Sequence, residues 1–156
     1  MSEARITEQL RLRLDEVGMV YQQLPITLER ARKATVGEAW HAFLIEQASA
    51  LKSQWHVLRD TATTWGKRTR PFYSPEVDEQ LNEALHAVRA KRIVPAMEER
   101  VRNVISVLRA RVLARLEEAI ELAARIREHD LVERLRHLYR EESELQSILE
   151  QGRSGS

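Results

Sequence analysis

The fold is decided by residues 115–149, which carry the sequence RLEEAIELAARIREHDLVERLRHLYREESELQSIL. Apolar residues recur in this stretch at alternating spacings of three and four, which is the period of an α-helix that buries one face. Asp130 is followed three residues later by Glu133, a pair that resembles a capping box and predicts a helix start. We therefore expect a long helix that ends at about Glu128 and, after a tight turn, a last helix that begins near Leu131.

The rest of the chain shows the same helical period. Ser74-Pro75-Glu76 predicts another helix start, since Ser caps free N–H groups and Pro suits the first helical position. The segment before it, TWGKRTRPFYS, has no periodicity and is expected to be a loop. The expected helices cover about residues 5–34, 38–65, 75–92, 96–128 and 131–149. We predict an all-α fold, namely a four-helix bundle with a long crossover that contains a short fifth helix.

Composition supports one helical domain. The chain has 156 residues, of which 43% are apolar and 31% charged, with five Gly, four Pro and no Cys. This is the size of a single domain, which we place at residues 1–150. Residues 151–156, QGRSGS, are expected to be a flexible tail or a remnant of cloning. The lack of Cys excludes disulfides, thiolate nucleophiles and Cys-ligated zinc.

Charge and hydropathy bear on location and partners. The formal net charge of +1 predicts no strong attraction to nucleic acid or to a membrane surface. No apolar run approaches the roughly 18 residues of a membrane span, and the first residues lack a secretory signal, so we expect a cytoplasmic protein. The 21 Arg against four Lys are typical of a GC-rich bacterial genome.

The charges are unevenly distributed along the chain. Residues 65–115 contain 11 Lys/Arg and six Asp/Glu, whereas residues 116–150 contain five and ten. This asymmetry favours association with a partner or between two copies, and a solvated helix surface is the alternative.

The helical pattern resembles the ferritin-like superfamily, in particular rubrerythrin and bacterioferritin. The resemblance rests on the Leu24-Pro25 step in the first helix, the segment around Phe43 to Leu58, the long crossover and residues 115–149. It implies a four-helix bundle and a carboxylate-bridged di-iron or di-manganese site. In such a site two helices each give a Glu, and the other two each give a Glu-x-x-His motif.

The ligands that this resemblance implies do not stand where the bundle needs them. Helical geometry places Glu38 of the Glu38/His41 motif, and both residues of Glu83/His86, on outer faces. The i, i+4 spacing of Glu133/His137 suits a metal but equally a surface pair. Between Glu99 and Glu117 the long helix has no Asp or Glu but several Arg, which opposes a divalent ion. We therefore expect no metal and no other cofactor.

One position breaks the apolar stripe of the last helix. Glu142 lies between Leu138 and Leu145, where a buried carboxylate requires a partner. If the chain folds back at about residue 129, Glu142 comes level with residues 115–117, so we predict a buried Arg115–Glu142 ion pair. The alternatives are that Glu142 reaches the solvent or that it is a remnant metal ligand.

A second apolar line indicates an interaction surface. Its members are Leu12, Met19 and Ile26 on the first helix and Leu113 and Ile120 on the long helix. Two apolar sides on one helix require two neighbours, which can be the crossover helix, a second copy or another protein.

The sequence contains no Gly-rich phosphate loop, no GxSxG motif and no His placed to activate a nucleophile, so we expect no enzyme activity and assign no catalytic residue. We predict a non-catalytic protein of interaction or scaffolding that works with a protein partner or as a homo-oligomer. The alternative is a ferritin-like di-metal-carboxylate protein of stress or iron metabolism.

Overall fold

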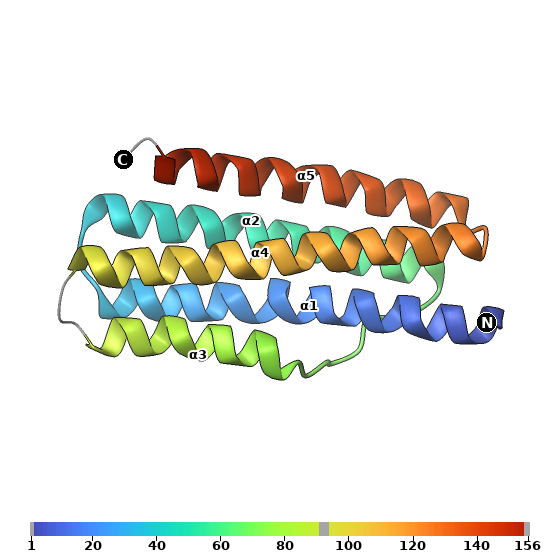
Figure 1. Ribbon diagram of the computed structural model, residues 1–156, viewed down its shortest axis with the longest axis horizontal. Coiled ribbons are helices and arrows are strands. Elements are labelled where there is room, and N and C mark those ends of the chain that lie inside the picture. Colours follow the sequence, from blue (N-terminus) through green and yellow to red (C-terminus); the bar gives the residue numbers. More distant parts are fainter. Residues whose placement is uncertain (1, 91–93, 155–156) are drawn as a thin grey trace.

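The computed structural model describes residues 2–90 and 94–154. Within these ranges the chain forms five α-helices (Figure 1). They are α1 (Glu3–Ala34), α2 (Glu38–Trp65), α3 (Pro75–Ala90), α4 (Val94–Arg125) and α5 (His129–Ser154). The predicted all-α class is therefore confirmed. None of the helices in the described part of the chain has the length and apolar character that crossing a bilayer requires.

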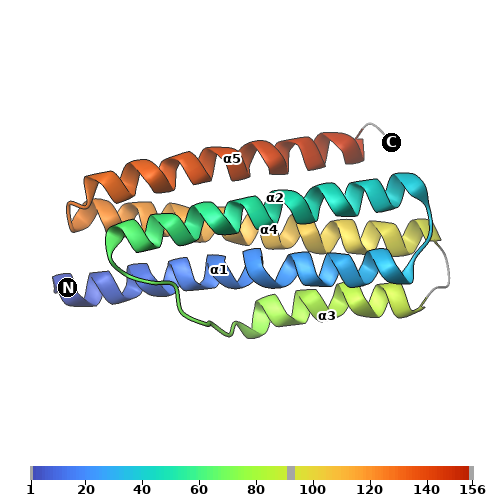
Figure 2. The ribbon, with the colours of Figure 1, turned by 180° about the vertical axis from the view of Figure 1, so that it is seen from behind.

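The helices lie lengthwise beside one another, with the start of α1 and the end of α5 at opposite ends (Figure 1). Helix α1 contacts α2 and α4, and α5 also contacts α4 and α2, so the four long helices close into a ring. Helix α3 packs outside this ring against α1 and α4. Both views show that α2 and α4 run in one direction and α1, α3 and α5 in the other (Figures 1 and 2). Each of the four long helices supplies fully buried leucines to the interior, among them Leu24, Leu51, Leu108 and Leu138.

The start of α3 agrees with its sequence signal. Ser74 precedes the helix, and its Oγ accepts a hydrogen bond from the backbone N–H of Val77 at 3.3 Å. Pro75 is the first helical residue, where its missing N–H costs no helical hydrogen bond. The expected end of this helix, at about Arg92, lies outside the described residues.

The turn between α4 and α5 lies earlier than the sequence predicted. Helix α4 ends at Arg125 rather than at about Glu128, and α5 begins at His129 rather than near Leu131. The reason is a Schellman-type turn centred on Arg127, whose φ is 58°. Asp130 does not cap α5 from outside but lies in its first turn, where its carboxylate pairs with Arg134 at 3.0 Å.

The C-terminal helix is also longer than expected. It continues to Ser154, four residues into the segment that was expected to be a flexible tail. This segment contains no Pro, so its backbone can continue the helical hydrogen bonds. Residues 155 and 156 lie outside the described part of the chain.

Candidate functional site

The centre of the ring contains a fully buried ion pair. Arg109 on α4 and Glu142 on α5 are both 0% exposed. The Nη1 atom of Arg109 donates hydrogen bonds to both carboxylate oxygens of Glu142, at 3.0 Å and 2.8 Å. An unpaired charge at this depth would cost several kcal/mol, so each of the two groups requires the other.

Polar side chains from α1 and α2 complete the cluster. Gln54 accepts a hydrogen bond from Arg109 at 3.2 Å through Oε1, and its Nε2 donates to Glu142. The same Nε2 lies 3.3 Å from the Tyr21 hydroxyl, which donates to Glu142 at 3.4 Å. Gln47 accepts from Nε and Nη2 of Arg109 at 3.2 Å and 3.0 Å. Each of the four long helices therefore contributes at least one polar side chain to one central network, which we call the central cluster.

The central cluster changes the chemistry of Tyr21. Burial raises the pKa of its hydroxyl well above the ordinary value of 10.0, and the negative charge of Glu142 raises it further. Tyr21 is therefore a neutral hydrogen-bond donor at physiological pH. Because Arg109 and Glu142 have no exposed surface, the cluster is closed to a substrate in this conformation.

The predicted Arg115–Glu142 pair is wrong in one partner. The structure places Glu142 in the interior, but its cation is Arg109, and Arg115 lies on the α1 side of α4. The turn after α4 comes earlier than assumed, so residues further back on α4 stand level with Glu142. Arg109 also lies on a buried face of α4, between Ile105 and Val112.

Arg115 belongs to a second network at the edge of the ring. Its Nε pairs with Glu16 on α1, and its Nη1 pairs with Glu118 at 2.9 Å. Arg111 also pairs with Glu16, at 2.8 Å, and reaches Glu76 on α3 at 3.8 Å. Burial opposes the ionisation of Glu16, but the two guanidinium groups outweigh it and lower the pKa of this carboxyl below 4.5. This network ties α1, α3 and α4 together.

The segment between α2 and α3 is fastened to α1. The carboxylate of Asp15, which is buried, accepts hydrogen bonds from the backbone N–H and the Nε of Arg70 at 2.9 Å and 3.4 Å. Arg70 also pairs with Glu8 at 3.0 Å. Together with Glu16, these carboxylates of α1 neutralise several of the basic residues in the positively charged block from 65 to 115.

A hollow of about 380 Å³ lies beneath this segment. Its lining includes Gly18, Gln22, Trp55 and Phe72. Gly18 allows close packing here, because a Cβ at this position would stand 3.2 Å from the ring of Trp55. The charged residue of the lining is Arg70, which is already engaged by Glu8 and Asp15.

The predicted interaction surface is not one continuous exposed face. Met19 is only 8% exposed, since the segment before α3 covers it and the backbone N–H of Ser74 contacts its sulfur at 3.3 Å. Met19 therefore does not belong to an exposed interaction surface, and the prediction is wrong for this residue. Leu12 and Ile26 are exposed, at 36% and 49%. Leu113 and Ile120 are half-buried, and Ile120 packs against the core.

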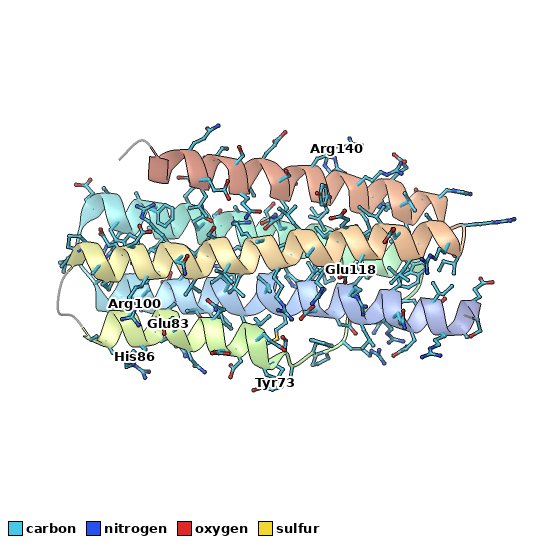
Figure 3. All side chains as sticks on the ribbon, in the orientation of Figure 1. Tyr73, Glu83, His86, Arg100, Glu118 and Arg140 are labelled. Carbon is cyan, nitrogen blue, oxygen red and sulfur yellow. The ribbon has the colours of Figure 1, made fainter. Side chains whose placement is uncertain are left out.

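The candidate metal residues are engaged elsewhere or point outward. Figure 3 shows Glu83 beside Arg100, with which it forms an ion pair, and His86 on the outer side of α3. The ring of His41 contacts the backbone carbonyl of Thr35 at 2.7 Å. Within residues 2–90 and 94–154, no three His, Asp or Glu side chains come together in an arrangement that could hold a metal ion.

Comparison with known proteins identifies a similar fold. No protein-family profile matches the sequence, and no curated protein matches it. The chain is similar in structure to YcfI, "a putative structural protein" from Rhodopseudomonas palustris, with a TM-score of 0.81. The match covers 93% of this chain and 92% of YcfI at 16% sequence identity. At this level of identity the likeness concerns the fold alone.

Proposed function

We propose that this chain is a non-catalytic helical-bundle protein that acts in protein–protein interaction or scaffolding. The observation that carries the proposal is the buried Arg109–Glu142 pair at the centre of the ring. In helical bundles that perform metal chemistry, inward side chains of facing helices form the site at this place. Here a guanidinium neutralises the carboxylate and the neighbouring amides satisfy both, so the polar groups join helices. The description of YcfI fits a non-catalytic role in a coarse sense.

We further propose that the four long helices form a ferritin-like four-helix bundle, with α3 and its flanking segments as the long crossover. The ring of helix contacts and the common direction of α2 and α4 support this arrangement. A single domain over residues 1–150 and a bacterial, cytoplasmic protein remain part of the proposal. They rest on the size, composition and charge of the chain.

The proposed interaction role is tested by the oligomeric state of the purified chain and by the complexes that it forms. Light scattering and chemical cross-linking with mass spectrometry are expected to detect a homo-oligomer or a stable complex with another protein. Ile26→Glu, on the exposed side of α1, should weaken this association, whereas Ile45→Glu on α2 serves as a matched control because Ile45 is similarly exposed. A strictly monomeric protein with no recovered complex would contradict the proposal.

A di-metal-carboxylate protein is the second candidate, favoured by one observation. Polar side chains from all four long helices converge on one central point, and one of them is a carboxylate. Metal analysis of protein purified from iron-supplemented cells separates the two functions. About two metal ions per chain, lost in Glu142→Gln, would support this candidate, whereas substoichiometric metal that Glu142→Gln retains would exclude it.

A further inference from the structure

The turn between α4 and α5 has no residue that terminates a helix. From Ala96 to Gln151 the sequence contains neither Gly nor Pro, so local propensity permits one continuous helix through residues 126–128. The turn therefore depends on the packing of α5 against the rest of the molecule.

A comparison with the end of α2 shows how unusual this turn is. Helix α2 ends with Gly66 at φ 90°, and Lys67 N–H bonds to the carbonyl of Ala62 at 3.0 Å. The turn after α4 has the same bond pattern, with Glu128 N–H bonded to the carbonyl of Ala123 at 3.0 Å. Its left-handed position is occupied by Arg127 instead of Gly. A side chain disfavours this conformation, so straightening the turn relieves strain.

Helix α5 is held by contacts that any copy of α5 could make. It packs on α4 and α2, and the hydrogen-bond partners of Glu142 all lie on other helices. None of these contacts requires that α5 be joined to the same α4. Short, strained connections between packed elements favour the exchange of such elements between identical chains.

We propose that two copies of this chain exchange α5. In each copy the turn at residues 126–128 straightens, α4 and α5 become one helix, and Glu142 pairs with Arg109 of the other copy. Because α4 and α5 run in opposite directions, a two-fold axis near the turn brings each α5 to the place that the other vacates. The inference rests on the proposed interaction role and names its partner as a second copy.

Two charge-reversed variants test the exchange directly. In Arg109→Glu or Glu142→Arg alone, the central cluster contains two like charges, so each variant is expected to fold poorly. In an exchanged dimer of one Arg109→Glu chain and one Glu142→Arg chain, both clusters contain one cation and one anion. Refolding the two variants together should give a dimer of equal composition and twice the chain mass of 18.1 kDa. Each variant refolded alone should give no such dimer.

The double variant Arg109→Glu/Glu142→Arg is the control, because it contains the reversed pair within one chain. If this control folds and the mixture forms no heterodimer, the exchange is refuted. If the control does not fold, the native chain decides the question after refolding at high protein concentration. A native dimer whose population falls about fivefold or more in Arg127→Gly supports the exchange, because Gly favours the closed turn.

The native chain also separates this inference from the broader proposal. A native dimer that Arg127→Gly leaves unchanged refutes the exchange but supports association through the molecular surface. A native chain that stays monomeric after refolding refutes the exchange. If it also yields no complex with another protein, the interaction role fails as well.

Discussion

The central ion pair leads to the sharpest prediction of stability. Replacing Glu142 by Leu removes the acceptor of two hydrogen bonds from Arg109, at 3.0 Å and 2.8 Å, and of those from Gln54 and Tyr21. Arg109 then keeps only amide partners, although its side chain is fully buried. Leaving a buried charge without its counterion is expected to cost about 3–5 kcal/mol in the free energy of unfolding.

The double variant Arg109→Met/Glu142→Leu removes both charges and fills similar space with apolar atoms. It is expected to be more stable than Glu142→Leu because no unpaired charge remains, but less stable than the native chain because the fully buried Gln54 loses its partners Arg109 and Glu142. The single variants Arg109→Met and Glu142→Leu and the double variant form a thermodynamic cycle, measured by urea unfolding with circular dichroism at neutral pH.

The exposed Arg136–Glu133 pair provides the control cycle, because the two side chains are 52% and 66% exposed. Its coupling should stay below about 1 kcal/mol. The reasoning is refuted if Glu142→Leu costs less than about 1 kcal/mol, or if the double variant loses as much stability as the two single variants together.

The remaining predictions concern four single substitutions. Tyr21→Phe should cost about 1–2 kcal/mol. The native chain should lose stability above pH 10.0, because Tyr21 ionises there in the unfolded state but not in the native state, and this loss should be smaller in Tyr21→Phe. Urea unfolding at neutral and alkaline pH measures the cost of the substitution and the pH dependence. The melting temperature of Glu16→Gln should fall less steeply on acidification than that of the native chain. The lowered pKa of Glu16 stabilises the fold above pH 4.5, and this stability is lost as the pH falls through the native pKa. Equal slopes of melting temperature against pH in the two proteins would contradict this. Gly66→Ala should cost about 1 kcal/mol in urea unfolding and Arg127→Gly should gain a similar amount, because both residues have positive φ and a Cβ at Gly66 meets nothing within 4 Å.

The sequence predicted the helices well because their signals are local. Apolar periodicity marked each long helix, and the Ser74-Pro75 step marked the start of α3. The turn after α4 was misplaced because no local residue determines it. Arg127 takes a conformation that its side chain disfavours, which only the packing of α5 explains.

The central cluster could be predicted only in part. Glu142 was found because a charge interrupts a leucine stripe, and this signal belongs to one helix. Its partner depends on the register between two helices, and a turn a few residues earlier moved the partner from Arg115 to Arg109. Gln54 gave no such signal, because a polar residue beside the large apolar Trp55 is expected to face the solvent, whereas the structure buries Gln54 fully and leaves Trp55 half-buried.

Gln54 lets the central cluster stay electrically neutral. Its amide presents an acceptor to Arg109 and a donor to Glu142, so it serves both ions without adding charge. Glu differs from Gln only in the terminal group, and with Glu at this position the guanidinium would face two anions. The excess negative charge would attract a proton or a small cation into the core. One neutral side chain thus keeps the net charge of the buried polar groups at zero, and a single substitution there would give the interior an affinity for positive ions.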